Sequence, residues 1–351
     1  MRTSPRPIPA RMRGAYLDTD LSITIRDLPV PTLAPGELLI RTRACGICSG
    51  DIMGWYMQRK APLVFGHEPA GEVAAIGPDV ATFRPGDRVF VHHHAPCMQC
   101  ELCQRGEFVQ CPAWRAARLD PGGMAEYFVV PEGNVREDTL ALPDEVSFVD
   151  GALVEPVACI VKSLRRAGLR GGERVAIIGL GIMGQLHVLL ARHAGARQVI
   201  GLDRVPFRLT RARELGADAT IDVDREDPVA RLQALTGGGM ADAVIIGPGS
   251  LEAMELGLAL AGRGATVVFF TTSRPDDRLA IQPHDLYFRE IRLVPSYSCG
   301  PDDTREALRL IQQGVVSAEQ VVTHRFPLDE IGEAYRMAGQ PVSLKTVVTF
   351  D

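Results

Sequence analysis

The segment Val175-Ala-Ile-Ile-Gly179-Leu-Gly181-Ile-Met-Gly184 places a G-x-G-x-x-G pattern between a run of apolar residues and an amphipathic helix. Apolar residues before the first glycine indicate a buried strand, and a helical pattern runs from about Met183 to Ala194. In such a turn Gly179 permits the sharp bend, Gly181 lets a pyrophosphate approach the backbone, and Gly184 lets helix and strand pack closely. The free N–H groups of the turn and first helical residues then face the anion. We therefore predict that a dinucleotide binds Gly179, Leu180, Gly181, Ile182, Met183 and Gly184.

The next strand, Gln198 to Asp203, ends on an acidic residue nineteen positions after Gly184. A carboxylate there accepts hydrogen bonds from the adenosine ribose hydroxyls and repels a 2′-phosphate, which favours NAD over NADP. Arg204 leaves the NADP alternative open, because a guanidinium can bind a 2′-phosphate or stack on adenine. Arg208 belongs either to the same edge of the site or to a solvated helix face.

Strands and helices alternate on both sides of this segment. Further strands are expected at Ala243 to Ile246, Ala265 to Phe270 and Ile291 to Val294, with helices at Val157 to Ala167, Phe207 to Leu215 and Leu251 to Leu260. Alternation at this spacing predicts an α/β domain with a doubly wound parallel sheet, a Rossmann domain, over residues 157–298.

The first part of the chain, residues 1–156, has a different texture. Short β-branched runs such as Leu38 to Thr42, Gly71 to Ile76 and Arg88 to Val91 lie between turns rich in Gly and Pro, which favours a small, irregular β-barrel. Residues 299–351, with a helix near Thr304 to Gln313 and a last strand at Lys345 to Phe350, are expected to return to this domain.

Four of the eight cysteines form one short cluster of the form C-x2-C-x2-C-x7-C. Cys97, Cys100, Cys103 and Cys111 would close a tetrahedron around Zn²⁺ and leave no open position, as structural zinc sites do. An iron–sulfur cluster is the competing interpretation, and four unrelated thiols the third.

A second group of ligand-type residues surrounds Cys48. Asp51 follows it in the same glycine-flanked loop, His67-Glu68 comes nineteen residues later, and Glu155 stands at the domain boundary. A thiolate, an imidazole and a carboxylate suit a catalytic zinc with an exchangeable position. Asp51 is the candidate for orienting the ring of His67. Each residue alone is more often a core or surface residue, and the prediction rests on their occurring together.

Composition excludes several other classes. The 351 residues carry a net charge of −5, which argues against a nucleic-acid or anionic-membrane surface. The chain contains no apolar stretch long enough to span a membrane, and its Pro- and Arg-rich start is unlike a secretory leader, so a cytoplasmic location is expected.

These features together resemble the zinc-containing medium-chain dehydrogenase/reductase family, and especially its polyol and threonine dehydrogenase branch. Other segments share the resemblance, among them Gly122-Gly-Met-Ala-Glu126-Tyr127 and Thr323-His-Arg-Phe-Pro-Leu328. It implies a GroES-like catalytic domain, a Rossmann domain and a homodimer or homotetramer. It also implies that Cys48, His67 and Glu68 hold the catalytic zinc, that Glu155 ligates it directly or through water, and that the four-cysteine cluster holds a structural zinc.

Two departures from the family pattern concern proton transfer. The family usually has Ser or Thr where this chain has Gly50, and many members have His where it has Met53. Ser49, shifted by one residue, or a water held by Glu68 or Glu155 would have to replace that relay. His94, three residues before Cys97, is a further candidate, since in the threonine branch this position approaches the substrate.

A third departure concerns the loop that faces the nicotinamide. It reads Gly247-Pro248-Gly249, where the family tends to carry an acidic residue and then a small one.

The expected function is hydride transfer between a secondary alcohol and NAD, with zinc as a second cofactor. A polyol, sugar alcohol or cyclitol is the favoured substrate, a β-hydroxy amino acid the alternative, and a simple secondary alcohol the third. A zinc- and NAD-binding sensor built on a dehydrogenase frame is the non-enzymatic alternative, because the usual relay is missing.

Overall fold

The computed structural model describes residues 7–351, and it divides into two compact units. Unit 1 contains the described residues up to Ala158 together with Cys299–Asp351, and unit 2 is Cys159–Ser298. Helix α6 (Val154–Ala167) runs through the division near its start.

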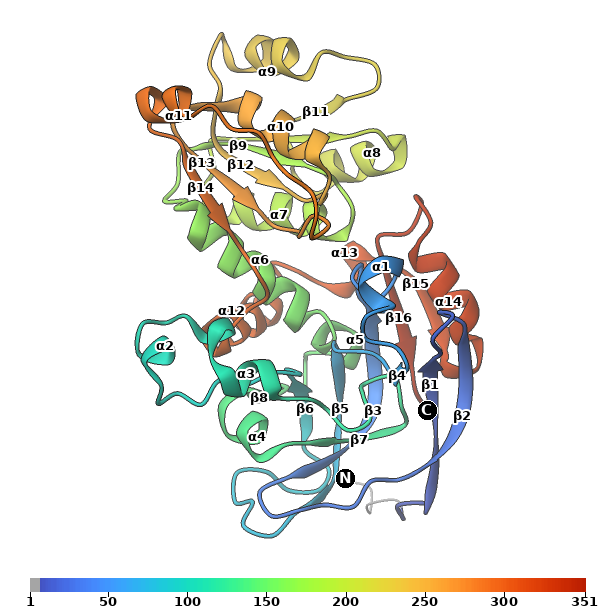
Figure 1. Cartoon of the computed structure of the whole chain (residues 1–351). Helices are drawn as coiled ribbons and strands as arrows, with labels where there is room; N and C mark the ends of the chain where they lie inside the picture. The colour runs from blue at the N-terminus through green and yellow to red at the C-terminus, as the bar shows by residue number, and fades with distance from the viewer. Residues whose placement is uncertain (1–6) are drawn as a thin grey trace. The chain divides into compact units, whose positions relative to one another are not determined.

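Unit 2 is built on a six-stranded parallel sheet of order β11-β10-β9-β12-β13-β14 (Figure 1). Helix α7 packs on β9 and β10, and α10 packs on β12 and β13. The elements are β9 (Arg174–Ile178), α7 (Ile182–His193), β10 (Gln198–Asp203), α8 (Pro206–Glu214), β11 (Ala219–Asp222), α9 (Pro228–Thr236), β12 (Ala241–Ile246), α10 (Leu251–Leu260), β13 (Ala261–Phe269), α11 (Pro283–Arg289) and β14 (Arg292–Pro295).

The strand order of unit 2 reverses between β9 and β12. Loops at the carboxyl ends of strands beside such a switch point form the ligand crevice of open α/β sheets. The inner strands are apolar along their whole length, for example Val175 to Ile178, because helices cover them and no face is left for polar residues. The Rossmann-type fold predicted from the glycine-rich segment is confirmed.

Unit 1 contains a sheet of order β15-β16-β3-β5-β6-β8, with β7 paired to β3, and a smaller sheet of order β2-β1-β4. Its strands are β1 (Arg11–Leu17), β2 (Ile23–Pro29), β3 (Leu38–Ile47), β4 (Leu63–Val64), β5 (Pro69–Ile76), β6 (Arg88–Val91), β7 (Tyr127–Val130), β8 (Thr139–Ala141), β15 (Val322–Pro327) and β16 (Lys345–Thr349). Its helices and 3-10 turns are α1 (Gly54–Met57), α2 (Glu101–Gln104), η1 (Phe108–Gln110), α3 (Pro112–Ala116), α4 (Glu132–Asp138), α5 (Phe148–Gly151), α12 (Pro301–Gln312), α13 (Ala318–Val321), η2 (Leu328–Glu330) and α14 (Ile331–Ala338).

The last strand of the chain completes the larger sheet of unit 1. β16 pairs antiparallel with β3, Thr346 opposite Ile47 and Thr349 opposite Ala44. This pairing extends β3 five residues beyond the predicted end at Thr42, so Gly46 lies inside a strand rather than in a loop. Long-range pairing of this kind leaves no local trace in the sequence.

Helix α6 also differs from its predicted bounds, since it begins at Val154 and not at Val157. Pro156 does not stop it, because the N–H groups of the first helical turn need no helical acceptor. Glu155 therefore lies in the first turn of a helix and is 6% exposed.

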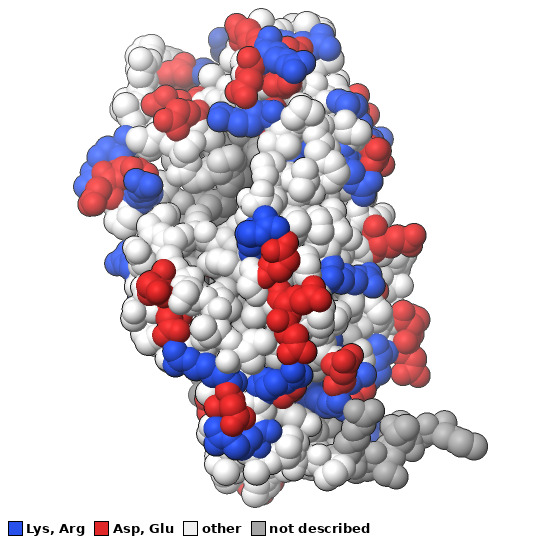
Figure 2. Space-filling view, turned by 90° about the vertical axis from the view of Figure 1, so that its right-hand side faces the viewer, with Lys and Arg blue, Asp and Glu red and all other residues white. Residues whose placement is uncertain are grey.

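Figure 2 shows acidic and basic side chains interspersed on the face that it presents, in keeping with the small net charge of the chain. None of the helices within residues 7–351 combines the length and the apolar character that crossing a membrane requires.

Candidate active site

The dinucleotide turn in unit 2 has the geometry that its glycines suggest. Gly179 adopts φ +83°, which favours glycine. A Cβ on Gly184 would lie 2.0 Å from the carbonyl oxygen of Gly179, whereas a Cβ on Gly181 would meet nothing within 4 Å. The turn is therefore closed where helix and strand pack and open at the N-terminus of α7, where an anion has room.

Asp203 ends β10 beside this turn. Its carboxylate accepts hydrogen bonds from the backbone N–H groups of Leu180 at 2.6 Å, Arg204 at 2.8 Å and Val205 at 2.9 Å. The nearest guanidinium nitrogen of Arg208 lies 3.9 Å away, while Arg204 is turned toward Asp224 at 3.8 Å. The structure thus brings Asp203 and Arg208 to the glycine turn, and it directs the Arg204 side chain to an exposed acidic partner.

The Gly247-Pro248-Gly249 loop follows β12, the strand next to β9. A Cβ on Gly179 would lie 2.7 Å from Cδ of Pro248, and the N–H of Gly247 donates to the carbonyl of Ile178 at 2.9 Å. The proline ring therefore packs on the glycine turn that follows β9.

The four-cysteine cluster of unit 1 forms a compact set of thiols. All four sulfurs lie within 4.8 Å of one another, with Cys100–Cys103 at 3.5 Å, Cys97–Cys111 at 3.6 Å and Cys97–Cys103 at 4.0 Å. A tetrahedron of Zn–S bonds of about 2.3 Å has edges of about 3.8 Å, so the set fits zinc. Backbone N–H groups of Gln99 and Cys100 lower the pKa of the Cys97 thiol to about 6, which favours the ligating thiolate.

A second donor set lies around Cys48, just after β3. The ligand atoms of Cys48, His67 and Glu68 lie within 4.8 Å of one another. Thiolate, imidazole and carboxylate are all zinc ligands, so this set also fits the metal. The backbone N–H of Gly50 donates to the sulfur of Cys48 at 3.4 Å.

Asp51 contacts two members of this donor set, Cys48 and His67, and thereby orients them. Its carboxylate lies 3.4 Å from Nδ1 of His67 and accepts the N–H of Cys48 at 3.1 Å, while Tyr335 from α14 donates to its backbone carbonyl at 2.7 Å. Burial alone would lower the pKa of His67, but Asp51 and Cys48 raise it well above the ordinary value. Contact with Asp51 at Nδ1 leaves Nε2 as the nitrogen available to a metal.

Glu68 forms an ion pair with Lys345 of β16, and both side chains are 1% exposed. Lys345 also donates to the carbonyl of Ile47 at 3.1 Å. A Cβ on Gly46 would lie 1.8 Å from Oε2 of Glu68, so only glycine leaves room for this pair. Lys345 is a residue of the site that sequence reasoning missed, because only the pairing of β16 with β3 brings it there.

Glu155 has different neighbours from those of the other predicted ligands of the catalytic zinc. Its carboxylate groups within 4.8 Å with ring nitrogens of His92 and His93. The ring of His93 lies 4.9 Å from that of His67, centroid to centroid, and its buried Nδ1 has no hydrogen-bond partner within residues 7–351. His93 was not singled out as a site residue in the sequence.

Two other candidates lie in different surroundings. His94 packs against Trp114, with ring centroids 4.0 Å apart, and its Nδ1 lies 3.1 Å from the carbonyl of Ala117. Burial lowers the pKa of His94 to about 3, so this ring is neutral. Ser49 is exposed.

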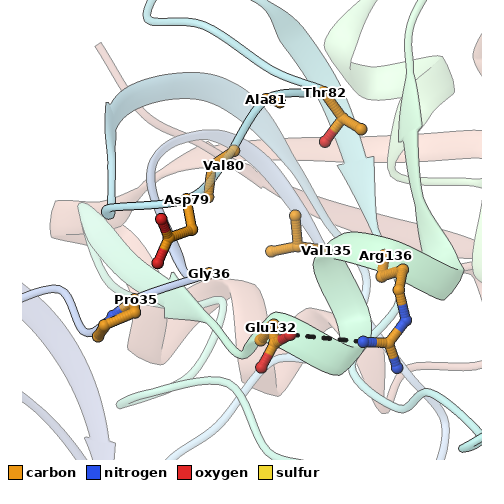
Figure 3. Close-up of a pocket in the computed structure, with 9 residues that line it drawn as sticks. All are labelled: Pro35, Gly36, Asp79, Val80, Ala81, Thr82, Glu132, Val135 and Arg136. Atoms are coloured by element: carbon orange, nitrogen blue, oxygen red, sulfur yellow. Dashed lines mark hydrogen bonds and ion pairs between the residues drawn. The ribbon is translucent and has the colours of Figure 1, made fainter.

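A surface hollow of about 380 Å³ lies elsewhere in unit 1 and contains none of these residues (Figure 3). Its walls come from the turn at Pro35, the turn at Asp79 and helix α4. An ion pair between Glu132 and Arg136 crosses part of its rim.

Comparison with known proteins gives two family matches along the chain. Residues 34–144 match the alcohol dehydrogenase GroES-like domain, and residues 183–313 match the zinc-binding dehydrogenase family. The first covers β3 to β8 and both metal-type donor sets, and the second covers most of the Rossmann-type unit.

Relatives and solved structures cover almost the whole chain. An L-threonine 3-dehydrogenase from Bacillus licheniformis is 30% identical over 88% of this chain and 90% of its own length, and a sorbitol dehydrogenase from Mus musculus is 30% identical over 94% and 93%. A structure described as a putative zinc-binding dehydrogenase from Sinorhizobium meliloti 1021 bound to NADP superposes with a TM-score of 0.87 at 30% identity, covering 97% of this chain and 100% of that one. The chain therefore belongs to the zinc-containing medium-chain alcohol dehydrogenase family, whose members are oxidoreductases that act on CH–OH donors.

Proposed function

We propose that this dehydrogenase oxidises a secondary hydroxyl group of a polyol, sugar alcohol or cyclitol and passes the hydride to NAD⁺. The observation that carries the proposal is the donor set of Cys48, His67 and Glu68, oriented by Asp51. Sorbitol dehydrogenases among the relatives favour a polyol. An L-threonine 3-dehydrogenase at the same identity favours a β-hydroxy amino acid as the second candidate.

In this proposal Cys48, His67 and Glu68 are the protein ligands of the catalytic zinc. A zinc ion bound there supplies Lewis-acid polarisation of the substrate hydroxyl. Glu155 then acts on this site through its charge or through water, because its carboxylate groups with His92 and His93. Cys97, Cys100, Cys103 and Cys111 hold a separate structural zinc.

Other side chains of the chain orient the ligands of this site and balance their charge. Asp51 holds the ring of His67, and Lys345 holds the carboxylate of Glu68 in a buried ion pair. The exposed hydroxyl of Ser49 stands between Cys48 and Gly50 and offers the proton a route to solvent that neither Gly50 nor Met53 provides.

Asp203 sets the proposed preference for NAD. Its carboxylate already accepts three backbone N–H groups at the glycine turn, which hold it in place at the end of β10. A 2′-phosphate would place a second negative charge against it.

The test is NADH formation, followed by its near-ultraviolet absorbance, with zinc-loaded enzyme and a panel of polyols, cyclitols, L-threonine and plain secondary alcohols. Reduction of NAD⁺ by polyols or cyclitols is the expected result, and Cys48→Ala should abolish it while the structural zinc stays bound. Turnover with L-threonine alone would replace the favoured substrate by the second candidate. Turnover by a Cys48→Ala protein without catalytic zinc would contradict the assigned site.

We further propose that the chain is a homodimer or homotetramer. The outer edge of β14 has no strand partner among residues 7–351, and the neighbouring helix α11 exposes Tyr287 and Phe288. A second copy of the chain would cover both.

A further inference from the structure

A series of aromatic rings joins the two zinc-type donor sets of unit 1. The ring centroid of His67, in the catalytic donor set, lies 4.9 Å from that of His93. The centroid of His94 lies 4.0 Å from that of His93 and 4.0 Å from that of Trp114. Trp114 packs in one cluster with Cys111, a member of the four-cysteine set. Since rings whose centroids lie within about 7 Å interact, His93, His94 and Trp114 form an unbroken ring column between the two donor sets.

Consecutive histidines can share this column because they do not lie on a strand. β6 ends at Val91, and His92, His93 and His94 follow it in irregular backbone. On a strand, neighbouring side chains would point to opposite faces. Here the rings of His93 and His94 are in contact, with 45° between their planes. The segment after β6 therefore places two consecutive rings side by side.

The end of the column at the cysteines is fixed by helix α3, which begins there. Cys111 is the N-cap residue of α3, and Trp114, with 1% of its surface exposed, is the third residue of the helix. Ala117, directly after α3, accepts a hydrogen bond from Nδ1 of His94 at 3.1 Å. His94 thus contacts α3 at the indole and again at the end of the helix. A metal that holds Cys111 therefore also holds the helix on which His94 packs.

At its other end the column supports the ring of His67. Asp51 contacts Nδ1 of His67 at 3.4 Å and so fixes one edge of the imidazole. His93 packs on the same ring, with 51° between the two planes. Nδ1 of His93 has no hydrogen-bond partner among residues 7–351, so ring packing holds this edge of His93. The direction in which His67 presents Nε2 therefore depends on where the rest of the column places His93.

We propose that His93, His94 and Trp114 are positioning residues that couple the structural zinc to the catalytic zinc. This inference rests on the proposed assignment of both donor sets to zinc. The four-cysteine loop has few apolar residues, so it has two states, one folded around its metal and one loosened without it. Only the folded state anchors the column that supports His67. Zinc at the cysteines therefore strengthens metal binding at the catalytic set, by about 5–150-fold, and the catalytic zinc strengthens the structural site by the same factor.

The first test measures how tightly the full-length protein binds Co²⁺ at the catalytic set, by competition with a chelator, while zinc fills the four-cysteine set. His94→Ala interrupts the column and should weaken this binding by about 5–150-fold, with the structural zinc retained. His94→Phe keeps a ring at this position and should restore the wild-type affinity. His324→Ala is the matched control and should change nothing, because His324 of β15 is also a half-buried histidine of unit 1 and lies outside the column.

The second test separates coupling from a local packing defect at His94. Cys100→Ser empties the structural site and should weaken Co²⁺ binding at the catalytic set by about the same factor as His94→Ala. Adding His94→Ala to Cys100→Ser should then have little further effect, because the column has already lost its anchored end. Additive losses in the double variant, or unchanged binding in either single variant, would overturn the proposal.

The visible absorption of the bound Co²⁺ is a readout that a general loss of stability would not move. It reports the geometry of the metal ligands, so His94→Ala and Cys100→Ser should shift the absorption band in the same way and His94→Phe should not. A wild type that binds fewer than two metal ions would contradict the zinc assignments themselves. Two bound ions without this coupling would overturn the role of the ring column alone.

Discussion

Gly46 shows how one missing side chain shapes the catalytic donor set. A Cβ there would lie 1.8 Å from the Glu68 carboxylate and 2.7 Å from Cε of Lys345. Both neighbours are buried and paired, so neither has space to move aside. We expect Gly46→Ala to displace Glu68, to weaken binding of the catalytic zinc by at least about 10-fold and to lower kcat/KM accordingly.

Gly50→Ala is the control for this substitution. The nearest atoms to a Cβ at Gly50 are Sγ of Cys48 at 3.7 Å and a ring carbon of Tyr56 at 4.0 Å, which are ordinary contacts. The measurements that compare the two variants are their zinc content and their steady-state rates. Equal effects of the two substitutions would show that Glu68 and Lys345 do not constrain the site.

Asp203 carries the prediction on cofactor choice. Ribose hydroxyls that donate to a charged acceptor contribute about 1.5–3 kcal/mol, which corresponds to about 10–150-fold in kcat/KM. Asp203→Asn keeps the shape but removes the charge, so the ratio of kcat/KM for NAD to that for NADP should fall by this factor. Glu255→Gln removes an exposed carboxylate of α10 instead and should leave the ratio unchanged. A wild-type preference for NADP would contradict the assignment.

At this scale the sequence predicts local sites well and distant partners poorly. Cys97 to Cys111 lie on one short stretch, and their spacing alone indicates a tetrahedral set. Lys345 meets Glu68, and Cys299 meets His92, only because strands and helices far apart in the chain fold together. Spacing rules contain no information about such pairs.

Among the elements, the loop around the four cysteines has an internal reporter. Trp114 of α3 is 1% exposed and packs with Cys103, Val109 and Cys111. Because this small cluster has few apolar residues, the metal is expected to supply most of its stability. In a Trp55→Phe background, which leaves Trp114 as the remaining tryptophan, Cys100→Ser should release one zinc and shift the fluorescence emission to longer wavelength.

Gln99→Ser serves as the control, since Gln99 is an exposed neighbour in the same loop. It should change neither zinc content nor emission. Loss of zinc from Cys100→Ser without a change in emission would mean that the loop keeps its fold without the metal.

Helices α6 and α7 are tied by a buried histidine within unit 2. His187 lies within hydrogen-bonding distance of the Ser163 hydroxyl and the Met183 carbonyl, at 2.8 Å each, and burial lowers its pKa to about 4. A depressed histidine pKa means that the unfolded chain binds the proton first. The contribution of His187 is therefore present above about pH 6.5 and is lost as the pH falls toward about 4, by about 2 kcal/mol at pH 5.

His187→Gln removes the titrating group and keeps a polar side chain. Between about pH 7 and pH 5 the melting temperature of the wild type should fall by about 4–8 °C more than that of the variant. Other acidic transitions, including loss of zinc, are common to both proteins and cancel in the difference. Parallel pH profiles would show that the ring of His187 does not remain neutral in the fold.

Helix and strand boundaries also show which elements the sequence predicts and which it does not. Strand Gln198–Asp203 and helix Leu251–Leu260 agree with their predicted bounds, because buried parallel strands and capped helices have strong local signals. β1 and β2 were not predicted. Most residues of β2 are exposed, so the alternation that marks a half-buried strand is absent.

For the whole molecule, the predicted combination of a GroES-like domain and a Rossmann domain is confirmed by the two family matches and by the sheets of the two units. The sequence pattern was sufficient to predict both domains because each contains a dense group of residues with one function. This group is the glycine turn in the Rossmann domain and the four cysteines in the GroES-like domain. Sequence pattern contains far less information on assembly, since an edge strand and an exposed aromatic residue look like any others until the sheet order is known.

The sheet order supports a specific prediction on the assembled state. β14 is the last strand of the sheet of unit 2 (Figure 1), and beside it Tyr287 and Phe288 of α11 are 76% and 64% exposed. An unpaired strand edge next to exposed aromatic rings favours burial against a second copy. Light scattering during gel filtration should give a molar mass of at least about twice 38.1 kDa for the wild type. Phe288→Asp should shift the mass toward the monomer, whereas Val342→Asp, at a valine of unit 1 that is 54% exposed, should not. A monomeric wild type would contradict the proposed oligomer. Equal effects of the two substitutions would contradict an interface at β14 and α11.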